Sequence, residues 1–316
     1  MHLQEVPSKS EIIAAHQRIR NFVHFTPVLT SQKLNKLFGV KMFFKAENLQ
    51  KGGSFKIRGA TNAILLNKES LKNGVATHSS GNHAQALALA AKNQGLTAHI
   101  VMPENAPKVK VQAVEGYGAH ITFCQPTLEA RETTLKNIVN KTGAMFILPY
   151  NSYDIIAGQA TMMKELVEEI DKLDAAFIPI GGGGLISGSI LSAEYFSPNT
   201  TVIGAEPEQA DDAYQSLKAG SFIPSKNPDT IADGLKTSLG DLTYPIIMKG
   251  VNDIITVSEQ EIVDAMKLIF TYLKQVIEPS AAVPLAALIK EKANFQKKKV
   301  GLVLCGGNVD LEKLPF

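Results

Sequence analysis

Short apolar segments alternate with longer segments of helical periodicity through most of this chain, and this alternation limits the folds open to it. Strands that alternate with helices in this way form βαβ units, which build a parallel sheet. We therefore expect an α/β protein whose ligand site lies beyond the carboxyl ends of its strands. The expected strands are 41–47, 74–79, 96–102, 119–124, 144–148, 175–180, 201–206 and 299–305, and the expected helices are 82–94, 107–117, 127–141, 155–170 and 185–196.

The chain has 316 residues, a length typical of about two domains. The three strand–helix units over 74–141 are compact enough to form a smaller domain set into a larger one. We expect a large domain from residues 1–73 and 152–316, and a small inserted domain from 74–151. One irregular segment, 222–245, interrupts the alternation and is a candidate to line a site.

Composition narrows the classes of protein to consider. Apolar residues make up 45% of the chain, charged residues 20%, and the net charge is +2, as in an ordinary globular enzyme. The lysine run 297–299 is too short for a nucleic-acid patch, and no apolar run reaches the ~20 residues of a membrane helix. The N-terminal residues lack the pattern of a secretory signal, and two cysteines, Cys124 and Cys305, cannot form a disulfide framework. We expect a cytoplasmic protein that binds neither nucleic acid nor membrane.

The segment IPIGGGGLISGSIL (178–191) places four glycines between an expected strand and an expected helix. Glycines let the backbone approach a phosphate, whose charge is stabilised by free N–H groups and the helix dipole. A tight turn is the alternative, although such a turn needs fewer glycines. A nicotinamide dinucleotide is a further alternative, because Gly182 and Gly184 begin a GxGxx pattern and Glu206 ends the next strand.

Three other strand ends and loops carry polar groups. In HSSGNHAQ (78–85), the backbone with Ser79, Ser80, Asn82 and His83 could bind a carboxylate, although His83 fits a capping or core histidine equally well. In GGSFKIRGA (52–60), the glycines and Ser54 read as a loop and N-cap, which places Lys56 in a helix's first turn, where the dipole disfavours a cation. In LVLCGGNVD (302–310), Cys305 ends a buried strand, where an isolated cysteine is usually inert.

Together, GSFKIRGA, SSGNHAQA, GGGGLISG and CGGNVD resemble the fold-type II pyridoxal-phosphate enzymes, in particular the serine racemases and short serine/threonine dehydratases. The resemblance covers nearly the whole chain and implies two parallel-sheet αβα domains, as in the tryptophan synthase β-subunit. It also implies that Lys56 bonds covalently to pyridoxal 5'-phosphate. The implied cofactor contacts are Phe55 on the ring, Asn82 at the ring's 3'-oxygen, Gly181, Gly182, Gly183, Gly184 and Leu185 around the phosphate, and Cys305 at the ring nitrogen.

The resemblance implies an α,β-elimination from a hydroxy amino acid. Lys56 removes the α-proton, Ser79, Asn82 and His83 bind the carboxylate, and serine or threonine gives a 2-oxo acid and ammonia. A neutral Cys305 thiol at the ring nitrogen makes a moderate electron sink, which favours prompt loss of a β-leaving group. Ser80 matches the serine that racemases use on the opposite ring face, so racemisation competes with elimination.

Two positions bear on which activity and which substrate the family resemblance implies, and alternatives stay open at both. Tyr150 stands where serine racemases have asparagine, which favours a dehydratase over a dedicated racemase. Arg131 matches a position that meets a second carboxylate, so β-hydroxyaspartate is an alternative substrate, and an exposed helix arginine is the ordinary interpretation. Two alternatives from other classes are a nicotinamide-dependent oxidoreductase and a non-catalytic amino-acid sensor.

The resemblance also implies ligands beyond the cofactor. Glu206, Ala210 and Asp212 match a divalent-cation site whose oxygen ligands suit Mg²⁺ or Ca²⁺, although acidic residues after a strand are usually only solvated. ATP is a candidate effector. Its matching positions are Gln85, Tyr117, Lys274 and Asn308. Relatives of this kind are commonly homodimers, and we expect the same here.

Overall fold

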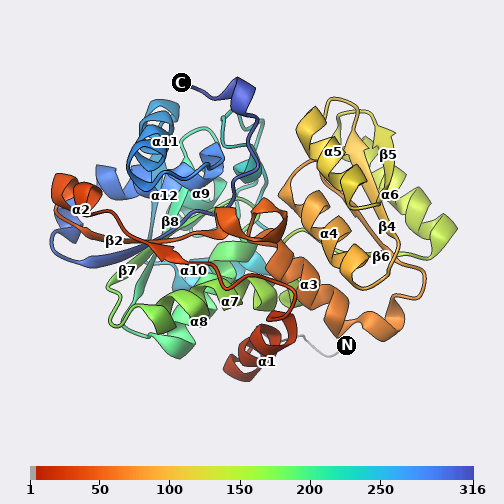
Figure 1. Ribbon diagram of the computed structural model, residues 1–316, viewed down its shortest axis with the longest axis horizontal. Helices are drawn as coiled ribbons and strands as arrows, with labels where there is room; N and C mark the ends of the chain where they lie inside the picture. The colour runs from red at the N-terminus through yellow and green to blue at the C-terminus, as the bar shows by residue number, and fades with distance from the viewer. Residues whose placement is uncertain (1–4) are drawn as a thin grey trace.

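The computed structural model describes residues 5–316 and contains two sheets flanked by helices (Figure 1). The larger sheet has six strands in the order β1-β2-β10-β7-β8-β9, and all neighbouring pairs are parallel except β1 with β2. Its strands are β1 (Val28–Leu29), β2 (Lys41–Lys45), β7 (Ala175–Pro179), β8 (Thr201–Pro207), β9 (Asp253–Val257) and β10 (Lys299–Val303).

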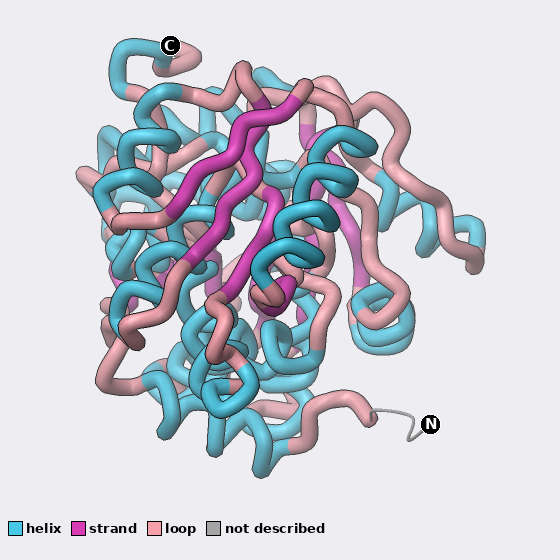
Figure 2. The backbone as a smooth tube through the Cα atoms, turned by 90° about the vertical axis from the view of Figure 1, so that its right-hand side faces the viewer, coloured by secondary structure: helices cyan, strands magenta, loops and turns pink. Residues whose placement is uncertain are grey.

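The smaller sheet is fully parallel and comes from one continuous stretch of chain. Its order is β5-β4-β3-β6, and its strands are β3 (Val75–His78), β4 (Ala98–Pro103), β5 (His120–Cys124) and β6 (Met145–Phe146). Figure 2 views the molecule from this side and shows the strands running side by side between helices. The helices that follow these strands are α4 (Asn82–Asn93), α5 (Lys108–Gly116) and α6 (Leu128–Thr142).

The remaining helices surround the larger sheet or lie between the two sheets, as Figure 1 shows for α3. The α-helices are α1 (Lys9–Ile19), α2 (Gln32–Phe38), α3 (Lys56–Leu66), α7 (Tyr153–Glu169), α8 (Gly184–Phe196), α9 (Asp212–Ala219), α10 (Thr243–Gly250), α11 (Glu259–Leu273) and α12 (Pro279–Lys290). Short 3₁₀ turns are η1 (Glu47–Leu49), η2 (Lys51–Gly53), η3 (Lys68–Ser70), η4 (Asp233–Leu235), η5 (Lys292–Phe295) and η6 (Leu311–Lys313).

Helices α3, α7 and α8 pack closely because a glycine lies at each of their crossings. A Cβ on Gly158 of α7 would lie 2.6 Å from the Cα of Gly59 on α3. A Cβ on Gly188 of α8 would lie 2.6 Å from the backbone nitrogen of Ala160 on α7. Helix α7 therefore fixes the position of α3 on one side and of α8 on the other.

The expected α/β fold with parallel sheets is confirmed, whereas several details differ. The strand expected over 144–148 is only two residues long, and helices α1, α2 and α9 to α12 and strands β1 and β9 were not predicted. The irregular segment ends at Leu242, because α10 begins at Thr243. The domain boundaries at 74 and 151 stay a prediction, and residues 1–4 of the N-terminal segment lie outside the described residues. No helix within residues 5–316 has the length and apolar content to cross a membrane.

Candidate active site

Lys56 is the first residue of α3, and its side chain is half-buried. Its Nζ donates a hydrogen bond of 2.8 Å to the carbonyl oxygen of Pro149 and lies 5.3 Å from the ring centroid of Phe55. Burial lowers the pKa of Lys56 to about 8, against smaller opposing effects of Cys305 and Glu278. An amine with this pKa is substantially neutral at slightly alkaline pH, as a nucleophile or base requires.

The start of α3 corrects one expectation. Ser54 does not cap the helix, because it forms an isolated antiparallel bridge with Gly306. Phe55 is the N-cap residue instead, and no side chain caps the helix there. The backbone N–H of Phe55 donates to the carbonyl oxygen of Cys305 at 3.1 Å, so the start of α3 is tied to the loop after β10.

The glycine loop, Gly181–Gly184, connects β7 to α8. Gly183 is the N-cap of α8 and has φ +87°, a left-handed conformation that favours glycine. The first N–H groups of α8 have no partner within the helix, and the positive end of its dipole faces the loop. This is the arrangement that binds a phosphate.

Neighbouring side chains leave no room for larger residues in this loop. A Cβ on Gly182 would lie 2.3 Å from the ring of Tyr150. The hydroxyl of Thr243 donates to the carbonyl oxygen of Gly182 at 2.9 Å. A Cβ on Gly181 would lie 2.9 Å from the carbonyl oxygen of Gly234, so the irregular segment does line this loop, as expected.

Ser79, Ser80 and Asn82 follow the carboxyl end of β3, and all three are half-buried. The hydroxyl oxygen of Ser79 accepts a hydrogen bond of 3.2 Å from the backbone N–H of Gly81. Asn82 is the first residue of α4, whose opening N–H groups have no intrahelical acceptor. Backbone and side-chain donors therefore gather here, as binding of a carboxylate requires.

His83 is buried, and its ring is already engaged. Its Nε2 lies 3.1 Å from the carbonyl oxygen of Ile147, and the hydrogen bond requires this nitrogen to carry the proton. Burial is the main cause that lowers the pKa of His83 to about 3. The ring is therefore neutral, and the backbone N–H of His83 is its available donor toward a carboxylate.

Cys305 follows β10 and is buried beside the start of α3. Burial, followed by the charge of Glu278, raises the pKa of the Cys305 thiol well above its usual range. The thiol therefore stays protonated and uncharged at neutral pH, in keeping with the role expected of it.

Glu278 is a buried carboxyl group at this site that the sequence did not single out. It is 2% exposed and precedes α12, yet it caps no backbone group of that helix. Its Oε1 accepts 2.7 Å from the amide of Asn82, whose own oxygen accepts 2.9 Å from the amide of Asn308. Its Oε2 has no hydrogen-bond partner among the described residues, and burial raises the pKa of Glu278 to about 7. Its sequence context, EPSAA, reads as an ordinary helix start, so no local pattern could have identified it.

Arg131 and the four candidate effector positions are expected to bind further ligands, and only some of them reach this site. Arg131 on α6 is half-buried, and its Nε lies 3.4 Å from the carbonyl oxygen of Thr127. After burial, the charge of Arg131 is the main factor that lowers the pKa of His78, the last residue of β3. Of the four candidate effector positions, Asn308 donates a hydrogen bond to Asn82. Within residues 5–316, the side chains of the other three form no hydrogen bond to a residue of the site. These are Gln85, Tyr117 and Lys274.

The candidate cation site brings two carboxyl groups together on β8 and α9. Glu206 is fully buried and accepts hydrogen bonds from the backbone N–H groups of Ala213 at 3.2 Å and Tyr214 at 2.8 Å. Burial and the nearby Asp212 raise the pKa of Glu206, and burial raises that of Asp212 to about 6. Asp212 Oδ1 is buried and has no hydrogen-bond partner within residues 5–316. Two adjacent buried acids with an unpaired oxygen fit a cation, although no group of three acidic, histidine or cysteine residues gathers within residues 5–316.

These groups also fit pyridoxal phosphate. The site combines an amine of lowered pKa at the start of α3, a neutral thiol just after β10, the Asn82 amide at the start of α4 and a glycine loop before α8. All of them lie near the carboxyl ends of parallel strands. The Oε2 of Glu278 is a buried polar atom without a partner within residues 5–316, and the first N–H groups of α8 have no acceptor within the helix.

Comparison with known proteins agrees with this geometry. Residues 19–306 match the family described as pyridoxal-phosphate dependent enzymes. A β-hydroxyaspartate dehydratase from Paracoccus denitrificans is 50% identical, with 98% of this chain and 99% of that protein covered. A serine racemase from Dictyostelium discoideum is 48% identical over 96% of this chain and 95% of its own length. The structure of maize serine racemase matches with a TM-score of 0.95 and 46% identity, over 98% of this chain and 95% of that one.

The fold is therefore the fold-type II arrangement of these relatives. The family match favours pyridoxal phosphate over the nicotinamide alternative. The roles of individual residues stay predictions, because they rest on the resemblance and on the geometry above. The family match covers most of the chain, and two relatives are about half identical to it, so the chain is homologous to these enzymes. The chain belongs to the pyridoxal-phosphate dependent enzymes, in the branch that contains serine racemases and hydroxyaspartate ammonia-lyases.

Proposed function

We propose that this protein is an ammonia-lyase that converts β-hydroxy amino acids to 2-oxo acids and ammonia, through loss of water and its return when the enamine hydrolyses. The observation that carries this proposal is the pairing of a Lys56 amine of lowered pKa with a neutral Cys305 thiol in one site. The amine supplies the base for the α-proton. The uncharged thiol supports prompt loss of a β-leaving group over a long-lived carbanion.

Different residues bind the cofactor, bind the substrate and move the proton. The glycine loop binds the phosphate of pyridoxal phosphate, and the donors at Ser79 and the start of α4 hold the substrate carboxylate. When bound, the cofactor draws electrons from the substrate's α-carbon. Lys56 then takes the α-proton, and the β-hydroxyl group departs as water after it receives a proton. The enamine released from the site hydrolyses in water to a 2-oxo acid and ammonia.

Racemisation is a second candidate activity, and the placement of Ser80 supports it. Ser80 is half-buried between Ser79 and Gly81, where β3 turns into α4. A hydroxyl on the face opposite Lys56 would return the proton with inversion. Relatives named serine racemase are also similar over almost the full chain.

The preferred substrate is the finer question, and Arg131 bears on it. Its guanidinium is near enough to His78, at the end of β3, to influence that residue's pKa. A cation beside the carboxylate-binding strand end suits a substrate with a second carboxylate. This placement supports 3-hydroxyaspartate beside serine and threonine, and one similar protein is named a β-hydroxyaspartate dehydratase.

One set of assays tests these proposals. Purified protein with pyridoxal phosphate is incubated with L-serine, D-serine, L-threonine and the isomers of 3-hydroxyaspartate, with and without Mg²⁺. Release of 2-oxo acid and ammonia, together with chiral analysis of the remaining amino acid, separates elimination from racemisation. Arg131→Gln is expected to lower kcat/KM for 3-hydroxyaspartate at least tenfold more than for serine. Ligand binding without any 2-oxo acid or inverted product would support the sensor alternative and refute the lyase.

A divalent cation at Glu206 and Asp212, together with the backbone carbonyl of Ala210, belongs to the same proposal. The two raised carboxyl pKa values and the unpaired Oδ1 of Asp212 support it. ATP as an effector, a homodimer and a cytoplasmic location stay predictions.

A further inference from the structure

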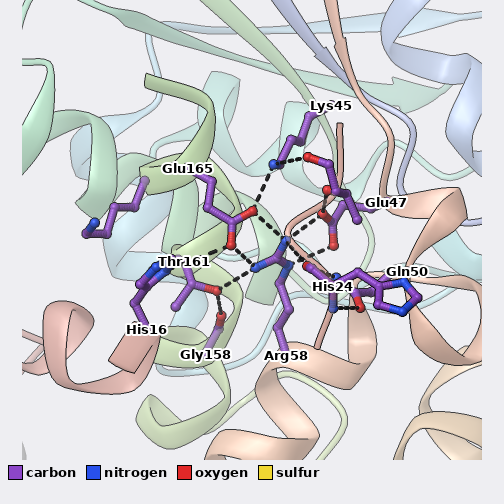
Figure 3. Close-up of polar contacts among 12 residues, drawn as sticks. His16, His24, Lys45, Glu47, Gln50, Arg58, Gly158, Thr161 and Glu165 are labelled. Atoms are coloured by element: carbon purple, nitrogen blue, oxygen red, sulfur yellow. Dashed lines mark hydrogen bonds and ion pairs between the residues drawn. The ribbon is translucent and has the colours of Figure 1, made fainter. Parts of the chain in front are cut away.

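A cluster of buried charges lies behind α3, and the reaction proposed above makes no use of it. We call it the Arg58 cluster, and Figure 3 shows it in close-up. Arg58 and Lys45 are 0% exposed, and the two carboxylates that face them are equally hidden from solvent. Its members are Lys45 on β2, Glu47 on η1, Arg58 on α3, and Thr161 and Glu165 on α7.

The guanidinium of Arg58 contacts two carboxylates, each through both of its oxygens. Nε and Nη2 lie 2.8 Å from the two oxygens of Glu47. Nη1 lies 2.7 Å and Nη2 2.8 Å from the two oxygens of Glu165. Nη1 also donates to the hydroxyl of Thr161 at 3.1 Å. Only the planar fork of arginine can make such paired contacts on two sides.

The charges within the cluster balance. Lys45 Nζ lies 2.8 Å from Glu165 and donates to the carbonyl oxygen of Thr26 at 2.7 Å. Two cations therefore face two carboxylates. Burial alone would lower the pKa of Arg58, but Glu47 and Glu165 together raise it above its usual value. Replacement of such a buried ion group by apolar residues is often neutral or stabilising, so stability alone is a weak reason to maintain it.

The location of the cluster suggests a different reason. Arg58 follows Lys56 by two residues, so the two side chains leave α3 on nearly opposite sides. The N-terminus of α3 has no side-chain cap, so local sequence does not fix its first turn. The cluster binds this turn from behind. Thr161 extends the link, because its hydroxyl donates 2.7 Å to the carbonyl oxygen of Gly158, where α7 meets α3 most closely.

We propose that Arg58 is a positioning residue for Lys56. Its paired contact with Glu165 holds the first turn of α3 against α7, and its paired contact with Glu47 ties the same turn to η1. Helix α7 also packs against α8, whose N-terminus forms the glycine loop. The cluster thereby fixes the distance between the Lys56 amine and the phosphate-binding loop. The inference rests on the role given to Lys56 under the proposed function.

The test uses the full-length protein with its cofactor removed, so it does not depend on activity. Lys56 is modified by reductive methylation at a series of pH values, and mass spectrometry of the peptide gives the midpoint of its reactivity. The titratable groups that face the Lys56 amine are Cys305 after β10, Glu278 before α12, His83 on α4 and Tyr150, whose ring centroid lies 5.9 Å from Nζ. None belongs to the Arg58 cluster, so a change within the cluster reaches Lys56 through its position and hydration.

Arg58→Lys retains the charge and removes the paired contacts. The midpoint for Lys56 is expected near pH 8 in the wild-type protein and at least one pH unit higher in this variant. Affinity for pyridoxal phosphate, measured by absorbance titration, is expected to fall at least tenfold. The matched control is Lys164→Met, which breaks the ion pair between Lys164 and Glu168 on the same helix α7; Lys164 forms no hydrogen bond or ion pair to α3 within residues 5–316. This control is expected to keep the wild-type midpoint and affinity.

A destabilised Arg58→Lys protein with the wild-type midpoint and affinity would show that the cluster is structural only and would overturn the proposal. If circular dichroism shows that Arg58→Lys is unfolded, Thr161→Val decides instead, because it removes one hydroxyl without altering charge. This variant is expected to shift the midpoint in the same direction by a smaller amount, and an unchanged midpoint would overturn the proposal. A wild-type protein that fails to bind pyridoxal phosphate would refute the proposed function, whereas the midpoint shift would still test Arg58.

Discussion

Lys56 should destabilise the cofactor-free protein at neutral pH, and Lys56→Met should relieve this cost. Burial lowers the pKa of Lys56 from 10.5 to about 8. At ~1.36 kcal/mol per pKa unit, this fall corresponds to about 3 kcal/mol of unfavourable free energy in the protonated folded state. Water that reaches the half-buried side chain reduces this figure. Removal of the amine also leaves the Pro149 carbonyl without its donor, which costs about 1 kcal/mol.

The net gain from Lys56→Met is therefore about 2 kcal/mol in the free energy of unfolding at pH 7. The unfolded chain binds the proton more tightly than the folded one, so the cost is fully present below pH 8. It declines as pH rises from about 8 to 10.5 and disappears above that range. The advantage of the variant should follow the same course and end slightly negative, because the lost hydrogen bond remains lost.

Urea unfolding of cofactor-free protein at pH 7, 9 and 10.5 measures this course. Lys68→Met is the matched control, because Lys68 is exposed just beyond the end of α3 and should show no such pH-dependent gain. A Lys56→Met protein that is no more stable than wild type at pH 7, or whose advantage does not change with pH, would refute the reasoning.

Three further outcomes follow from the geometry. Gly182→Ala places a Cβ 2.3 Å from the ring of Tyr150, so the affinity for pyridoxal phosphate should fall at least tenfold in absorbance titrations. A second substitution, Tyr150→Ala, should restore part of this affinity. Because the pKa of Asp212 is raised to about 6, its unpaired charge destabilises the cation-free protein more as pH rises, so Mg²⁺ or Ca²⁺ should raise the Tm more at pH 7.5 than at pH 5. Ser80→Ala should lower racemisation of L-serine by about 100-fold or more, as loss of a proton donor does, and should affect elimination far less.

Local sequence predicted the parts of the site that one strand end or one loop can make alone. The glycine loop between β7 and α8 and the polar groups between β3 and α4 lie where the alternation of strands and helices placed them. Each depends on a few consecutive residues. The parallel sheets were predictable for the same reason, since apolar runs between helical segments are a local pattern.

Contacts between distant segments were not predictable in this way. Ser54 fails as an N-cap because Gly306, far along the chain, pairs with it. Glu278 and the carbonyl of Pro149 reach the site only through the packing of α12 and of the segment before α7. Arg58 looked like one more helix residue, because Glu47 and Glu165 meet it only in the folded protein.

The site's electrostatics follow from where these segments meet. The N-termini of α3, α4 and α8 lie near one another, and each brings the positive end of a helix dipole. Together with burial, this disfavours the cationic form of Lys56 and leaves unpaired N–H groups for anions. The Cys305 thiol stays neutral because its pKa is raised, and burial raises the pKa of Glu278 to about 7, so Glu278 is only partly ionised near neutral pH. A ligand with a phosphate and a carboxylate would complement this field, because its anionic groups would meet helix ends beside an amine whose pKa is lowered to about 8.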